Sequence, residues 1–211
     1  MTVTLGACRA SIEGVQTAGW NHNIHYHRIV LRSVPPGAAL ALDVGCGEGL
    51  LSRRLRAQVG DVVAIDRHQA SVDLARAQSS GDIAYVAGDF MNYPLRPASF
   101  DFIASVASLH HMDVAAALNR MRTLLRPGGR LVVIGLARSS RPADWAVDAV
   151  AMFVNRVYKR WKREVEDGAP RVWPAPLTYS QTRKIARCAL PLAQYRRRLL
   201  WRYSLVWTAP G

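Results

Sequence analysis

Three glycines alternate with other residues in the segment 45–49, which we call the glycine loop. The loop follows the short apolar run at residues 40–44, which predicts a buried parallel strand that turns sharply into a helix. Because glycine has no Cβ, such a turn lets a ligand lie directly against the backbone. Asp43 stands two positions before the first glycine, and its negative charge favours a cationic or amine-bearing ligand over a pyrophosphate. These residues predict a cofactor site.

The spacing of the glycines bears on which cofactor is bound. Dinucleotide-binding turns space their glycines G-x-G-x-x-G, whereas this loop reads G-x-G-x-G. The loop alone leaves a nucleotide turn or a purely structural glycine turn as alternatives.

Two further carboxylates follow predicted strands. Residues 61–66 form an apolar run that ends at Asp66, about 20 residues beyond the glycine loop, the spacing at which an acid accepts hydrogen bonds from ribose hydroxyls. Residues 83–90 predict a third strand, which ends at Asp89. Each aspartate has the alternative role of capping a helix, but acids at three successive strand ends favour a shared site.

Strand and helix patterns alternate through the first two thirds of the chain, which predicts an open parallel sheet with right-handed crossovers. Asp113 is expected to cap its helix, and Pro127-Gly128-Gly129 to end it. The further expected helices are residues 21–34, 50–55, 69–78 and 113–125, and the further expected strands are 100–107 and 130–135.

The last third of the chain predicts a helical insertion and a closing strand. Over residues 142–163, apolar side chains recur at helical spacing: Trp145, Ala149, Phe153, Val157 and Trp161. This helix is expected either to cover a substrate pocket or to pack on the sheet. After a loop at residues 164–176, Thr178 and Gln181 predict a capping box for a helix over 179–189. The alternation over residues 201–207 predicts a strand.

The positive charge is concentrated near the carboxyl end. The chain of 211 residues has a formal net charge of +13, and residues 138–211 carry 15 basic and 5 acidic side chains, a net of +10. Such a region is suited to nucleic acid, an anionic membrane or an acidic substrate, or it is simply a solvated surface.

Other classes of protein are disfavoured by composition. Half of the residues are hydrophobic, and no segment has the pattern of a secretion signal or the length of a membrane span, so we expect a cytoplasmic protein without a span. Cys8, Cys46 and Cys188 are widely spaced, so neither a disulfide framework nor a metal site is expected.

Several motifs together resemble the class I S-adenosylmethionine (SAM)-dependent methyltransferases, and specifically enzymes similar to the ubiquinone and menaquinone biosynthesis group. The resemblance covers about half of the chain and is carried by residues 42–51, 64–66, 88–90, 99–101, 109–111 and 124–131. It implies an α/β, Rossmann-like, doubly wound sheet of seven mostly parallel strands, with an antiparallel carboxyl-terminal strand and a helical insertion over the pocket. We expect one domain, made of a leader and lid helix (1–36), a SAM-binding core (37–137), a helical insertion (138–177) and a closing helix with strands (178–211).

The resemblance also implies roles for individual residues. Gly45, Gly47 and the backbone of Cys46 would contact the methionine part of SAM. The adenosine part would be bound through its ribose by Asp66, through its adenine by Asp89 and Phe90, and along its edge by Arg67. Ser105 and Val106 would face the cofactor near its methyl group.

The chemistry expected is in-line transfer of a methyl group to a small-molecule oxygen, nitrogen or carbon atom. Alignment of the reactants does most of the work, and a base is needed only when the acceptor must lose a proton. Five of the six histidines lie in two clusters, at residues 22–27 and 110–111, which suggests a titratable pocket. His111 is the first candidate base and His110 the second, while His22 and Tyr26 are candidate substrate contacts.

Two other functions are open from the sequence. The basic tail suggests a nucleic-acid methyltransferase, but residues 105–108 lack the Asp/Asn-Pro-Pro-aromatic signature typical of enzymes that methylate base amino groups. The alternative is a regulator that binds SAM without catalysis.

Overall fold

The computed structural model describes residues 21–161 and 175–211. Residues 1–20 of the predicted leader, which include Cys8, and residues 164–174 of the predicted loop lie outside this part. In chain order the elements are α1 (His22–Arg32), β1 (Leu40–Val44), α2 (Leu50–Arg56), β2 (Asp61–Asp66), α3 (Gln69–Ala77), β3 (Ala84–Ala87), β4 (Phe100–Val106), the short 3₁₀ helix η2 (Leu109–His111), α4 (Val114–Leu124), β5 (Leu125–Leu136), α5 (Pro142–Trp161), α6 (Tyr179–Ala189), β6 (Gln194–Arg197) and β7 (Arg202–Thr208).

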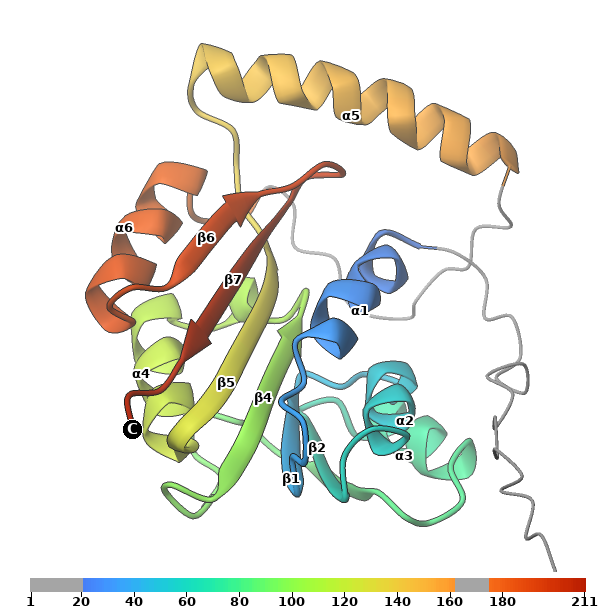
Figure 1. The fold of residues 1–211 in the computed structure, drawn as a ribbon. Coiled ribbons are helices and arrows are strands. Elements are labelled where there is room, and N and C mark those ends of the chain that lie inside the picture. The colour runs from blue at the N-terminus through green and yellow to red at the C-terminus, as the bar shows by residue number, and fades with distance from the viewer. Residues whose placement is uncertain (1–20, 162–174) are drawn as a thin grey trace, which may run out of the picture.

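The strands form one sheet of seven, in the order β3-β2-β1-β4-β5-β7-β6 (Figure 1). Strands β1 to β5 pair in parallel, and β7 runs antiparallel to both β5 and β6. From β1 the chain adds β2 and β3 on one side and then β4 and β5 on the other, so the order of the strands reverses between β1 and β4. Open α/β sheets bind their ligands at this point. The predicted Rossmann-like fold with an antiparallel closing strand is confirmed.

Helices cover both faces of the sheet, so β1 is buried on both sides. Leu42 and Val44 pack into the cluster that includes α4 and α6, whereas Ala41 packs into the cluster that includes α1, α2 and α3. A strand buried in this way needs apolar residues at successive positions, which explains the continuous apolar run that identified it.

The predicted helix caps are present. Asp113 accepts a hydrogen bond from the backbone N–H of Ala116, and Thr178 and Gln181 form the reciprocal capping box at the start of α6. Strand β5 begins earlier than predicted, because Leu125 pairs directly with Phe100 before the register shifts. The seventh strand, β6, was not located from the sequence, since its residues are polar and it pairs only with β7.

Helix α5 lies across the carboxyl ends of the strands, above α1 (Figure 1). Its predicted apolar stripe faces outward: Trp145 is 61% exposed and Phe153 is 70% exposed. The expectation that this stripe would cover the pocket or pack on the sheet is therefore wrong for the described side chains. The inward face instead carries the small Ala151, together with Val154 and Tyr158.

Two carboxylates fix this orientation of α5. Arg197 of β6 forms ion pairs with Asp144 and with Asp148, the latter at 2.7 Å, and its guanidinium lies 4.1 Å from the ring centre of Tyr179. Because these groups are largely buried, the ion pairs hold the polar side of α5 against the sheet, and the apolar stripe is left on the outside.

Candidate active site

A cavity of about 580 Å³ lies at the carboxyl ends of β1, β2, β3 and β4, a size typical of small-molecule sites. Among its described lining residues are those at the strand ends, Gly45, Asp66, Gly88 and Val106, and none comes from α5. The other lining residues that matter below are Asn21, Asn23, Ile24, His27, Cys46, Gly47, Arg67, Asp89, Phe90, Ser108 and His111.

The glycines of the loop are required for different reasons. Gly45, Gly47 and Gly49 all have positive φ, at 75°, 51° and 74°. A Cβ on Gly45 would lie 2.3 Å from the Cβ of Ser108, and one on Gly49 would lie 2.5 Å from the hydroxyl of Tyr85. A Cβ on Gly47 would meet no protein atom within 4 Å. Gly47 therefore borders open cavity space, where a ligand could approach its backbone.

Asp43 does not line the cavity. Its carboxylate is 1% exposed beneath the glycine loop and accepts a 2.7 Å hydrogen bond from the hydroxyl of Ser52. Burial raises the pKa of Asp43 to about 7, although the Ser52 hydrogen bond opposes this rise. Its hydrogen bond with Ser52 links β1 to α2, and Asp43 is not among the described residues that line the cavity.

Asp66 connects β2 to the glycine loop. Its Oδ2 accepts a hydrogen bond from the backbone N–H of Gly47 at 2.9 Å, and its Oδ1 accepts one from the N–H of His68 at 2.9 Å. Asp66 thus borders the cavity and bonds the backbone just before α3, whose N-cap residue is His68. Arg67 lies beside it on the cavity lining.

Asp89 and Phe90 line the cavity just after β3, the strand next to β2. Asp89 accepts hydrogen bonds from the backbone N–H of Met91 and the side chain of Asn92. Phe90 is 3% exposed, with the guanidinium of Arg120 5.3 Å from its ring centre. Because Arg120 also donates to the backbone oxygen of Phe90, this wall is held rigidly.

At the end of β4, Val106 lines the cavity, whereas Ser105 is fully buried. The hydroxyl of Ser108 donates to the backbone oxygen of Val44 at 2.8 Å, which leaves the hydroxyl of Ser105 to donate to Ser108. Ser105 therefore supports Ser108. Ser108 was not predicted from the sequence, where its only signal was its position three residues beyond Ser105.

The two histidines of η2 have different surroundings. His111 lines the cavity, and its pKa is lowered mainly by burial and also by Arg67, while Asp66 raises it. His110 does not line the cavity; its ring lies 4.1 Å from that of His111, and burial lowers its pKa to about 4. Its Nδ1 is buried without a hydrogen-bond partner among the described residues.

Helix α1 presents a different set of side chains from the predicted pair. The hydroxyl of Tyr26 donates to the backbone oxygen of Leu199, and His22 Nε2 lies 2.9 Å from Oδ1 of Asn155. Neither residue lines the cavity, because both are directed toward the carboxyl-terminal part of the chain. Asn23 and His27 line it instead.

His27 is a buried, neutral histidine at the cavity. Its Nδ1 accepts a hydrogen bond from Arg54 at 3.1 Å, since an arginine donates only. Burial, reinforced by the charge of Arg54, lowers the pKa of His27 to about 3. The sequence cluster of histidines at residues 22–27 contained His27, but nothing in the sequence singled it out as the histidine that lines the cavity.

Within residues 21–161 and 175–211, no three histidine, cysteine or acidic side chains are grouped as a metal site would require. In the same part of the chain, no helix has the length and apolar character needed to cross a bilayer.

Comparison with known proteins identifies the family. Residues 42–133 match the family model described as a methyltransferase domain. An uncharacterized methyltransferase of Mycobacterium tuberculosis is 39% identical over 198 residues, which cover 90% of this chain and 98% of the relative.

Solved structures share the fold at lower identity. The N-methyltransferase NodS from Bradyrhizobium japonicum, in complex with S-adenosylhomocysteine, is 17% identical, with a TM-score of 0.59 over 89% of this chain and 87% of that one. A putative methyltransferase from Haloferax volcanii, in complex with the Trm112 activator, is 17% identical, with a TM-score of 0.62 over 89% of this chain and 91% of that one. Because the mycobacterial relative matches nearly the whole chain, the protein belongs to the methyltransferase family and is a methyl-transferring enzyme.

Proposed function

We propose that the protein transfers a methyl group from SAM to a small-molecule acceptor bound in the same cavity. The observation that carries the proposal is the open space over Gly47 beside the carboxylate of Asp66, at the edge where parallel sheets bind their ligands. A cavity of about 580 Å³ is suited to a cofactor and a compact acceptor.

The cofactor is held along the strand ends. The backbone of Gly45, Cys46 and Gly47 contacts its methionine part, and Asp66 accepts hydrogen bonds from its ribose hydroxyls. At the other end, Asp89 accepts from the adenine amino group and Phe90 contacts the ring, while Arg67 borders the adenosine. The NodS neighbour was solved with S-adenosylhomocysteine, the product that SAM leaves after methyl transfer, which supports this assignment.

When bound, SAM supplies a methyl group attached to a positively charged sulfur. The protein's task is therefore mainly alignment of the acceptor with that methyl group. The rigid end of β4, where Ser105 and Ser108 are tied to Val44, is suited to this task because its position is fixed by hydrogen bonds.

His111 is the group that accepts a proton from the acceptor when one must be lost. It borders the cavity, and because its pKa is lowered it is neutral, and so able to act as a base, at neutral pH. His110 lies behind it and positions its ring. We assign the acceptor to the side of the cavity lined by Asn23 and His27 of α1, rather than to His22 and Tyr26.

The test is transfer of labelled methyl from SAM into an extract that is then separated into small-molecule, protein and nucleic-acid fractions. We expect label in the small-molecule fraction, lost in Asp66→Ala and kept in Asp73→Ala, a control that changes an exposed carboxylate away from the cavity. Label in the nucleic-acid fraction would contradict the small-molecule acceptor, and SAM binding without transfer to any fraction would favour a regulator.

A further inference from the structure

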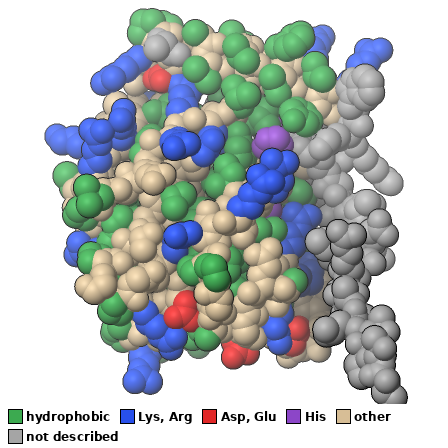
Figure 2. Space-filling model, in the orientation of Figure 1, with side chains coloured by type: hydrophobic (Ala, Val, Ile, Leu, Met, Phe, Trp, Pro, Cys, Tyr) green, Lys and Arg blue, Asp and Glu red, His purple; other side chains and the backbone are tan. Residues whose placement is uncertain are grey.

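Helix α5 carries large apolar side chains that are exposed to solvent. Trp145, Val150, Met152, Phe153 and Val157 are between 44% and 70% exposed. At 100° per residue they lie within one broad arc of the helix, opposite the inward residues Ala151 and Tyr158. Figure 2 shows hydrophobic side chains gathered along the top of the molecule, over α5. We call these five residues the α5 patch; soluble surfaces usually scatter such residues singly.

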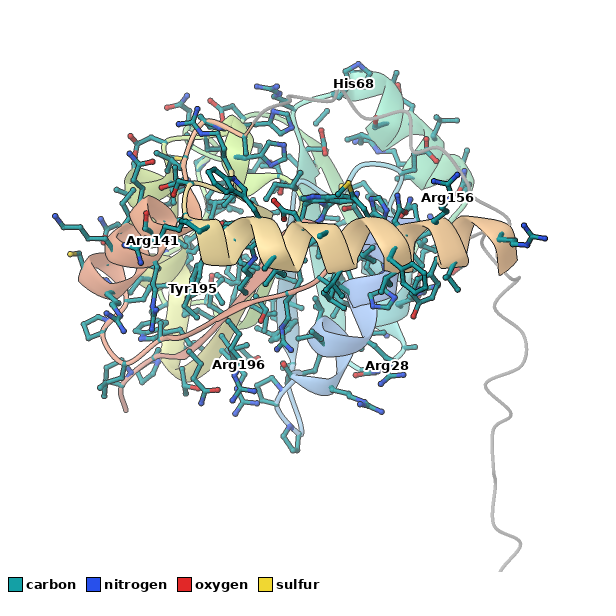
Figure 3. All side chains as sticks on the ribbon, turned by 90° about the horizontal axis from the view of Figure 1, so that it is seen from above. Arg28, His68, Arg141, Arg156, Tyr195 and Arg196 are labelled. Atoms are coloured by element: carbon teal, nitrogen blue, oxygen red, sulfur yellow. The ribbon has the colours of Figure 1, made fainter. Side chains whose placement is uncertain are left out.

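The charge on this outer face has one sign. The two acidic residues of α5, Asp144 and Asp148, are turned inward and paired with Arg197. Arg156 and Arg160 are exposed on the outer side with the α5 patch, and Arg141 is exposed just before the helix begins. In Figure 3, Arg141 and Arg156 lie toward opposite ends of α5. The outer face therefore offers cations beside apolar side chains, with no described carboxylate of the helix among them.

We propose that the α5 patch, with Arg156 and Arg160, binds the surface of a bilayer that contains anionic phospholipids. A helix with Trp, Phe and aliphatic residues exposed beside arginines lies in the plane of a bilayer, with its apolar side chains below the headgroups. The long arginine side chains reach the phosphates while their stems stay among apolar groups.

An anionic bilayer fits this face better than nucleic acid does. Single-stranded nucleic acid is bound by rows of aromatic platforms beside cations. Most of the α5 patch is instead aliphatic: Val150, Met152 and Val157 offer no base-stacking face beside the two aromatic members. The helix lies on top of the fold and does not span, so binding would be peripheral. Because α5 crosses the carboxyl edge of the sheet, where the cavity lies, this docking brings the cavity close to the bilayer (Figure 1). The inference does not depend on the proposed acceptor.

The test is co-sedimentation of the full chain with vesicles. We expect binding to mixed phosphatidylglycerol and phosphatidylcholine vesicles, weakened by salt, and little binding to phosphatidylcholine alone. Trp145→Ser with Phe153→Ser should lower partitioning at least about tenfold, and Arg156→Gln and Arg160→Gln about fivefold each. The matched controls, Leu74→Ser and Arg96→Gln, change an exposed apolar and an exposed basic residue elsewhere and should leave partitioning unchanged.

A second measurement keeps the test independent of any loss of folding. Trp145→Phe retains the apolar surface, so it should still bind vesicles, but the fluorescence blue shift that wild type shows on binding should shrink. Equal binding to neutral vesicles, or binding that the α5 variants leave unchanged, would overturn the proposal. The proposal would also be overturned if the protein did not bind vesicles but formed a dimer, or an RNA complex, that depended on Trp145 and Phe153.

Discussion

The carboxylate of Asp66 accepts a hydrogen bond from the backbone N–H of Gly47 at 2.9 Å, which joins the end of β2 to the glycine loop across the floor of the cavity. The same carboxylate accepts from the N–H of His68 at the start of α3. One side chain therefore fixes two backbone segments that border the proposed cofactor site.

Asp66→Ala is expected to lower the affinity for S-adenosylhomocysteine by about tenfold to a hundredfold, because it removes a charged acceptor together with the support of the loop. Isothermal titration calorimetry measures this. Asp73→Ala is the control, and equal affinity in the two variants would show that Asp66 does not contact the ligand.

Gly45→Ala and Gly47→Ala should fail in different ways. The new methyl group at residue 45 overlaps the side chain of Ser108, so this variant should lose several kcal/mol of stability or fail to fold. The methyl group at residue 47 meets no protein atom, so the cost is about 1 kcal/mol of backbone strain, with a larger loss of cofactor affinity. Thermal melts with and without S-adenosylhomocysteine separate the two effects, and equal melting temperatures of the free variants would contradict the prediction.

The pH dependence of turnover tests His111. Its pKa is lowered by burial and by Arg67, so kcat/KM should begin to fall only below the usual pKa of histidine, about 6.5. Arg67→Gln removes one cause of the lowered pKa, so the pH at which kcat/KM begins to fall (the acid limb of the profile) should rise. The rise should be only a fraction of a pH unit, because Arg67 is exposed and its charge is screened. His111→Ala should abolish the limb, and an unchanged profile in this variant would remove His111 from the mechanism.

Stability should depend on pH through His27. Its pKa is about 3 in the folded state and about 6.5 when unfolded, so between these values only the unfolded state binds the proton, and stability falls as pH falls. From about pH 7 to about pH 5 this group alone should cost about 2 kcal/mol. Urea unfolding of wild type and His27→Gln at both pH values measures it; an equally steep loss in the variant would assign the effect to other groups.

Arg197→Met should loosen α5. It leaves Asp144 and Asp148 without their cation in a largely buried setting, which should cost about 2 to 4 kcal/mol and increase amide exchange along α5. Asp73→Ala breaks an exposed pair with Arg76 and should cost less than about 1 kcal/mol. Similar losses in the two variants would mean that the Arg197 pairs do not anchor the helix.

Local sequence determined the sheet and the floor of the cavity. The apolar run at residues 40–44, the alternating glycines, Asp66 at the end of β2 and Asp89 just after β3 are signals with short-range causes. These causes are burial on two faces, positive φ, and a strand end that must turn. Parallel strands bring their carboxyl ends to one edge, so Asp66 and Asp89 had to border the same site once the strands were recognised. The caps at Asp113 and Thr178 followed for the same local reason.

Tertiary packing decided which face of each helix points where. Periodicity groups Tyr26 with His22 and separates them from His27, but only the packed structure turns Tyr26 toward Leu199 and His27 toward the cavity. It also buries Asp43 beneath the loop. In α5 the pairing of Arg197 with Asp144 and Asp148 overrides the apolar stripe, because a buried cation must be neutralised while an exposed tryptophan is tolerated. The arginine comes from a strand about 50 residues away, so the sequence of the helix could not indicate its orientation.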